Sequence, residues 1–251
     1  MKRRTFLKAA ATFSAVSVLT PSFTLANEEK NPFGITKKPR KFEVKNSYNF
    51  EQSKEITQLW IPLPKDEDYQ KVVSFKYDGN FSEAKIVKNP YNTRVLYVKW
   101  NDANIKPTLE VDFGVVMQER TTDFSKATSN TNYPSEVLEF LEGTKHIPIT
   151  KGLTAYVNDI TKNSKTPLQK AQAIYDWTVS TMYRDESVIG CGIGDAQKSI
   201  EEKIYGGKCT DISSVFVCLL RNAKIPARET FGIRVGQSKI SNACGKADEK
   251  G

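Results

Sequence analysis

Cys209 is the residue of this sequence best placed to act as a nucleophile. It follows Gly206, Gly207 and Lys208 and begins a long apolar segment with helical spacing. A thiol in the first turn of a helix lies at the positive end of the helix dipole, and this field favours the thiolate. The unpaired backbone N–H groups of that turn can also hold the oxyanion of an acyl-transfer intermediate. The position therefore predicts thiol-based acyl chemistry, and the alternative is an ordinary buried cysteine at a helix start.

The other cysteines have different settings. The four cysteines are separated by 18, 9 and 26 positions, which fits no Cys-x-x-Cys metal pattern, and the chain has one histidine, so we expect no metal site and no cofactor. Cys218 lies nine residues after Cys209, on the opposite side of a helix, and is predicted to be an inert core residue. Cys191 and Cys244 lie in loop-like stretches and are the pair free to form a disulfide in an oxidising compartment.

Helices are expected to position Cys209 in the second half of the chain. The predicted helices are residues 135–141, a segment capped by Thr150, a segment capped by Thr166 with Pro167 in its first turn, residues 195–203 and residues 211–223. The last of them is apolar on most sides, which is typical of a buried central helix. The sequence "KIPAR" ends it, and the alternation over residues 227–235 predicts a strand.

The first half has the alternation of half-buried antiparallel strands. About six such segments lie between residues 41 and 118, separated by turn sequences such as "YDGN" and "KNPYN". In "LWIPLP", the two prolines end a strand or confine it to a sheet edge. The polar stretch 119–133 is predicted to be a linker. We therefore predict an α+β protein with an N-terminal β-sandwich-like domain and a helical second domain.

The segment "GGKCTDISSVFVCLLRNAKIPAR" resembles the signature of the transglutaminase-like superfamily, which includes bacterial cysteine peptidases and acyltransferases. The matching features are the glycine before the nucleophile, Cys209, Asp211, the apolar helix, Arg221 and "IPAR" at residues 225–228. "QKAQAIYDWTVSTMYR", with Trp177 and Tyr183, resembles the helix before that core, and "LWIPLP" resembles part of the β domain that precedes the core in bacterial members. The resemblance implies a papain-like α+β core over residues 134–251.

The resemblance also implies a Cys-His-Asp triad acting on peptide or protein amides, with the histidine and aspartate on strands after the cysteine. Only 42 residues follow Cys209, and none is a histidine. We therefore expect a domain incomplete at its C-terminus that is inactive or impaired, with a non-catalytic binding module or degenerate fragment as the alternative. His146 lies 63 positions before Cys209 and is interpreted as a surface or loop-packing residue. The alternative is a catalytic base, because triads recur with different chain orders.

The N-terminal residues 1–26 have the layout of a secretory signal, with a basic head, an apolar stretch and a small-residue site ending at Ala26. Arg3-Arg4 followed by Phe6-Leu7-Lys8 resembles a twin-arginine signal, and a Sec signal or an uncleaved anchor is the alternative. We expect the twin-arginine machinery as a partner, a periplasmic or extracellular location, and no stable membrane span because the apolar stretch is short. Residues 27–40 then form an N-terminal arm.

The charge excludes nucleic acid as an expected partner. The whole chain carries a formal charge of +8, but residues 1–26 hold four basic residues and no acidic one, which leaves +4 on the remainder. The remaining lysines and arginines are interleaved with acidic residues and form no stripe with aromatics. A solvated, mildly basic surface explains this composition.

Overall fold

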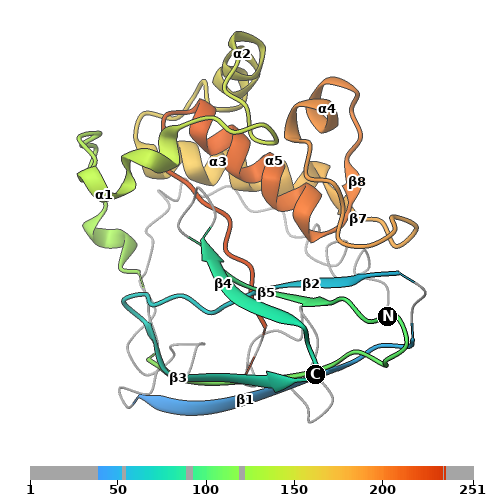
Figure 1. The fold of residues 1–251 in the computed structure, drawn as a ribbon. Helices are drawn as coiled ribbons and strands as arrows, with labels where there is room; N and C mark the ends of the chain where they lie inside the picture. Colours follow the sequence, from blue (N-terminus) through green and yellow to red (C-terminus); the bar gives the residue numbers. More distant parts are fainter. Residues whose placement is uncertain (1–38, 53–54, 89–92, 119–121, 234, 236–251) are drawn as a thin grey trace, which may run out of the picture. The chain divides into compact units, whose positions relative to one another are not determined.

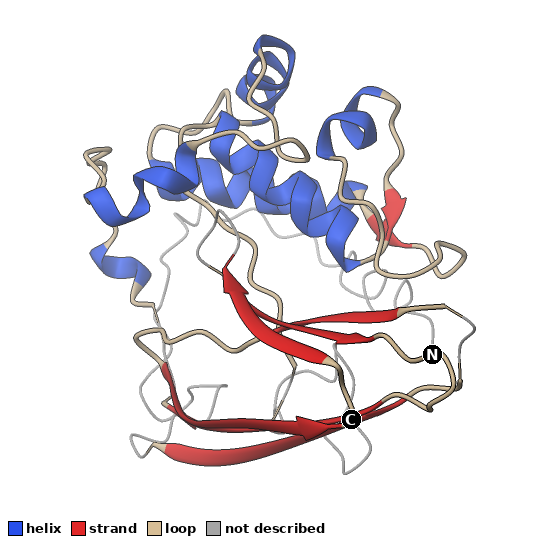
Figure 2. Cartoon of the chain, viewed as in Figure 1, coloured by secondary structure: helices blue, strands red, loops and turns tan. Residues whose placement is uncertain are grey.

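The computed structural model describes residues 39–52, 55–88, 93–118, 122–233 and 235. The described residues divide into two compact units, the first containing those up to residue 118 and the second residues 122–233. Strands make up the regular structure described in the first unit, and helices dominate the second (Figures 1 and 2). The predicted α+β class is therefore confirmed.

The first unit contains two antiparallel sheets that share one apolar core. The strands are β1 (Arg40–Asn49), β2 (Thr57–Pro62), β3 (Gln70–Gly79), β4 (Glu83–Lys88), β5 (Arg94–Trp100) and β6 (Thr108–Met117). The strand orders are β1-β6-β3 and β2-β5-β4. Leu96 and Trp100 from one sheet and Val111 from the other are fully buried in the same cluster. Two sheets that bury facing apolar side chains form the expected sandwich-like arrangement.

The prolines of "LWIPLP" act as the sequence predicted. Strand β2 lies at the edge of its sheet and pairs only with β5, and Pro62 is its last residue. An edge strand tolerates proline because the missing N–H would otherwise face away from the neighbouring strand.

The second unit surrounds one long helix with shorter elements. Its elements are η3 (Phe124–Lys126), α1 (Ser135–Leu138), η4 (Glu139–Leu141), α2 (Lys151–Ile160), α3 (Pro167–Thr181), β7 (Tyr183–Arg184), α4 (Ala196–Glu201), β8 (Gly206–Gly207) and α5 (Cys209–Asn222). The predicted caps are present: the Thr150 hydroxyl accepts from the Leu153 N–H, and Thr166 forms a capping box with Gln169. The helix predicted over 135–141 is an α-turn followed by a 3₁₀ turn.

Helix α5 is the central element of the second unit. It packs against α2, α3 and α4, and Val215, Cys218 and Leu219 have no exposed surface. In Figure 1, α3 and α5 run beside each other with α2 and α4 next to them. A helix enclosed on most sides has few ways to move, so its first turn is held in one place.

Arg221 ties the end of α5 to two other segments. The side chain is nearly buried, and its guanidinium donates to the Ala227 carbonyl over 2.8 Å and to the Glu142 carbonyl over 2.7 Å. The Ala227 N–H in turn donates to the Phe140 carbonyl. The arginine and the "IPAR" segment that follows the helix therefore form one contact, which explains why they belong to the same sequence signature.

The strand predicted over residues 227–235 is wrong in the described part of that segment. Residues 224–233 have no helix or strand, and the side chains of Phe231 and Ile233 are about 60% exposed (59% and 61%). Alternation of apolar and polar residues is compatible with a strand, but a strand also needs a neighbouring backbone to satisfy its N–H and C=O groups. The described residues of the second unit pair only at β7 and β8.

Candidate active site

Cys209 is the first residue of α5, and its side chain is exposed. Lys208 precedes the helix in extended conformation, and its own side chain is almost fully buried. Strand β8 leads into this position and pairs in parallel with β7, which places Arg184 opposite Gly207. A reactive side chain at the exposed tip of a buried helix is both accessible and fixed, as nucleophilic chemistry requires.

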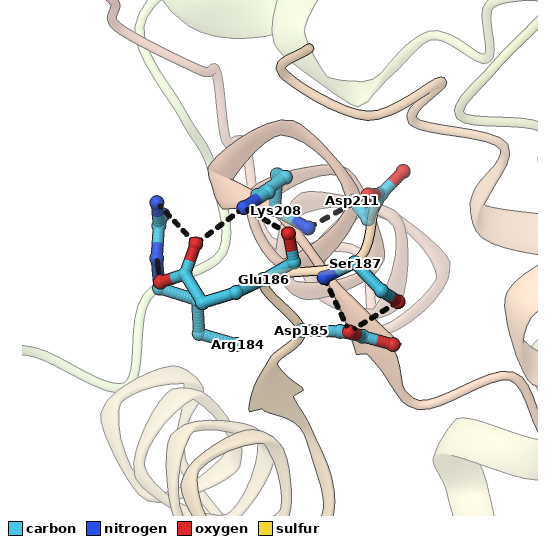
Figure 3. Close-up of polar contacts among 6 residues, drawn as sticks. All are labelled: Arg184, Asp185, Glu186, Ser187, Lys208 and Asp211. Carbon is cyan, nitrogen blue, oxygen red and sulfur yellow. Dashed lines mark hydrogen bonds and ion pairs between the residues drawn. The ribbon is translucent and has the colours of Figure 1, made fainter. Parts of the chain in front are cut away.

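The Asp211 carboxylate joins the helix start to a loop 17 or 18 residues earlier in the chain. One oxygen accepts hydrogen bonds from the Ile193 and Gly194 N–H groups, and the other accepts one from the Lys208 N–H. Each donor–acceptor distance is 2.9 Å. Figure 3 shows the bond to Lys208. The contact to Lys208 is the acidic half of a capping box. We call this three-bond contact the Asp211 clasp.

Two glycines leave the space that the Asp211 clasp occupies. A Cβ built at Gly192 would lie 2.0 Å from an Asp211 carboxylate oxygen, and one built at Gly207 would lie 2.6 Å from the Asp211 Cβ. Gly192 also has φ +92°, a conformation that other residues rarely adopt. The absence of a side chain at Gly207 thus makes room for the Asp211 side chain of the same unit.

The loop held by the Asp211 clasp contacts the start of α5. The Thr210 N–H donates to the Cys191 carbonyl over 3.3 Å, so the loop backbone meets the residue immediately after Cys209. The Thr210 N–H is one of the first-turn donors that were expected to hold an oxyanion, and this bond already uses it. The Cys209 N–H has no hydrogen-bond partner in the part of the chain that the structure describes.

Two cations share a carboxylate beside Cys209. The Arg184 Nε donates to one oxygen of Glu186 over 2.6 Å, and the Lys208 Nζ is paired with the other oxygen (Figure 3). The hydrogen bond from Arg184 and then that from Lys208 lower the pKa of Glu186 to about 2. Glu186 therefore stays ionised throughout the physiological range. Sequence reasoning missed Glu186, because no helix or strand pattern relates it to Lys208, 22 residues later.

Cys218 lies in the core, as predicted. It has no exposed surface, and its thiol donates to the Pro148 carbonyl over 3.4 Å. Burial raises the pKa of Cys218 to about 12, because a thiolate there would lack water. Cys191 and Cys209 carry exposed free thiols. Cys244 lies outside the described residues, so the expected pair between Cys191 and Cys244 stays a prediction.

His146 lies in a loop before α2 and is exposed. Its carbonyl accepts from the Ala196 N–H over 3.1 Å. Within the described residues, no hydrogen bond or ion pair joins its imidazole to Cys209. The structure therefore brings together Cys209, Asp211 and Lys208 but does not add His146 to that group.

The described residues contain neither a cluster of metal-binding side chains nor a helix that could span a membrane. In residues 39–52, 55–88, 93–118, 122–233 and 235, no three His, Cys, Asp or Glu side chains gather where they could hold a metal ion. Over the same part of the chain, no helix combines the length and the apolar character needed to cross a bilayer.

The fold and the similarities to known proteins now define the class. Residues 154–249 match the family model of the transglutaminase-like superfamily. An uncharacterized protein of Haemophilus influenzae (strain Rd) is 35% identical over 252 residues, covering 94% of this chain and 68% of that protein. The crystal structure of a candidate cysteine protease from Cytophaga hutchinsonii matches with a TM-score of 0.60 at 16% identity, over 75% of this chain. The match covers 65% of that protease, so this chain spans less than two thirds of its length.

The family match and the similar crystal structure agree with the α+β fold described above. The class is that of α+β proteins with a papain-like core. The chain belongs to the transglutaminase-like superfamily.

We predict that Asp211→Ala destabilises the second unit by about 2–4 kcal/mol, because three backbone donors lose a charged acceptor. The measurement is urea unfolding followed by labelling of Cys218, which becomes accessible only when this unit opens. Asp176→Ala, which removes an exposed carboxylate from α3 that accepts only from Gln172, is the matched control and is expected to stay within about 0.5 kcal/mol. Equal effects of the two substitutions would contradict the clasp.

We also predict that iodoacetamide labels Cys209 at least about tenfold faster than Cys218 between pH 7 and 9, because thiolates react and the buried thiol resists ionisation. The measurement is peptide mass spectrometry of the folded protein after timed labelling. Urea-unfolded protein serves as the control, in which the two rates should converge. Faster labelling of Cys218 in the folded protein would remove the basis for distinguishing the two residues.

Proposed function

We propose that Cys209 is the nucleophile of thiol-dependent acyl chemistry on peptide or protein amides. The observation that carries the proposal is an exposed thiol at the first turn of the buried helix α5, fixed there by the Asp211 clasp. Membership of the transglutaminase-like superfamily supports this interpretation, and so does the name given to the protease of similar fold. We propose the same substrate class for this chain.

The chemistry begins with attack of the Cys209 thiolate on an amide carbonyl carbon. The carbonyl electron pair moves to oxygen, and the Cys209 N–H is positioned to donate to that oxyanion. The intermediate then collapses to a thioester, the C–N bond breaks, and the departing amine takes a proton. Water or a second amine finally attacks the thioester and releases Cys209.

The last two steps need a proton donor and acceptor, and in the part of the chain that the structure describes no hydrogen bond or ion pair joins a histidine to Cys209. The single histidine of the sequence is His146, which lies in an exposed loop, and no histidine follows Cys209. We therefore propose that these 251 residues are acylated at Cys209 but turn over poorly.

Export is a further part of the proposed function. Residues 1–26 contain Arg3-Arg4 followed by Phe6-Leu7-Lys8, and these residues lie outside the described part of the chain. We propose twin-arginine export to the periplasm or beyond.

For export, we predict that changing Arg3 and Arg4 together to lysine blocks translocation of a reporter fused after Ala26, because the export machinery reads the arginine pair. The measurement is the reporter's distribution between cytoplasmic and exported fractions. Lys2→Arg is the matched control and should leave export unchanged. Normal export of the double lysine variant would argue for a Sec signal instead.

For activity, we predict that residues 27–251 show no significant turnover of peptide or glutamine-amide substrates, because losing one triad member typically costs several orders of magnitude. The measurement is amine release over time at known enzyme concentration. The matched control is the same protein extended at its C-terminus by a segment from a superfamily member that carries the histidine and aspartate. Turnover by residues 27–251 that His146→Ala abolishes would show that His146 is the base and overturn this account.

A further inference from the structure

Glu186 occupies a position built for a carboxylate. Its two oxygens are held by Arg184 and Lys208, and a second Arg184 nitrogen lies 3.4 Å from the oxygen facing Lys208. A fork of donors around both oxygens is the usual way in which proteins recognise carboxylates. The three residues appear together in Figure 3, at the side of the helix start.

The two cations lie next to the nucleophile. Lys208 is adjacent to Cys209 in the chain, and Arg184 pairs with Gly207 in the β7–β8 ladder. The pKa of Arg184 is raised first by its hydrogen bond and charge interaction with Glu186, and to a smaller extent by the charge of Cys209. Both cations thus belong to the segments that lead into Cys209, and we expect a group bound by them to lie near its sulfur.

The partners differ greatly in exposure. The Lys208 side chain is 10% exposed, whereas that of Glu186 is 72% exposed. A nearly buried ammonium is costly without a counter-charge. An ion pair with an exposed carboxylate contributes little to stability. The Lys208 Nζ also donates to the Glu186 backbone carbonyl, a contact that does not involve the Glu186 side chain. The counter-charge at Lys208 therefore need not come from Glu186.

We propose that Arg184 and Lys208 form a carboxylate-binding subsite, which accepts an acidic group of the peptide substrate when Glu186 swings out. The inference rests on the proposed function and assigns a substrate preference to the same site. The acidic group is either an Asp or Glu side chain or a free C-terminal carboxylate. In the absence of substrate, the Glu186 carboxylate fills this subsite and competes with weakly binding ligands.

The test is protection of Cys209 from iodoacetamide, a neutral reagent whose methylene carbon bonds to sulfur as iodide leaves. The ligands are acetyl-Ala-Asp-amide, acetyl-Ala-Asn-amide and acetyl-Ala-Ala with a free carboxylate. We expect saturable protection by at least one of the two acidic peptides and none by the Asn peptide. The acidic peptide that protects identifies the source of the carboxylate. Comparing rates with and without peptide in each variant cancels changes in thiol ionisation.

Variants link this protection to the subsite. Glu186→Gln is expected to lower the half-protecting concentration about two- to fivefold, and Arg184→Gln to raise it by a similar factor, the range of exposed ion pairs. Asp159→Asn and Lys162→Gln remove the members of an exposed ion pair in the same unit and are the matched controls, expected to change nothing.

Three results would overturn the subsite. The first is equal protection, or equal lack of it, by the acidic and Asn peptides. The second is a half-protecting concentration that neither Glu186→Gln nor Arg184→Gln changes. In both cases Cys209 still reacts, so the proposed function stands. The third is a Cys209 that iodoacetamide does not label at all, which overturns the subsite and the proposed function together.

Discussion

The Asp211 carboxylate is the contact on which the candidate site depends. It accepts from the backbone of residues 193 and 194 and from Lys208, and so joins the loop before α4 to the start of α5. Backbone donors at a helix start need partners, and a carboxylate there also complements the helix dipole. One side chain thus satisfies local hydrogen bonds, begins the helix and sets the surroundings of Cys209.

The helix behind the Asp211 clasp is packed on most sides. Helix α5 is enclosed by α2, α3 and α4, and Arg221 anchors its far end to carbonyls of two other segments. Packing therefore restrains the helix along its length, while hydrogen bonds restrain its two ends. A nucleophile on such a support needs little reorganisation to meet a substrate, which is how rigid scaffolds favour reaction.

The sequence predicted features whose causes are local. Thr166 with Gln169 and Thr150 carry their capping chemistry within four residues, and the apolar pattern of α5 follows from its burial on most sides. What it missed depends on segments far apart in the chain. The pairing of Glu186 with Lys208 and the clasp to residues 193–194 are tertiary contacts. The helical or strand periodicity of apolar residues does not indicate such contacts. The strand predicted at 227–235 failed for the same reason, because alternation does not supply a pairing partner.

We propose that Cys209 performs the first covalent step. The most direct measurement is the intact mass of residues 27–251 after reaction with an activated acyl ester, followed by peptide mapping. We expect one acyl group per chain, located on Cys209 and absent from the Cys209→Ser variant. An acyl group carried by Cys191 or by lysines, with Cys209 unmodified, would contradict it.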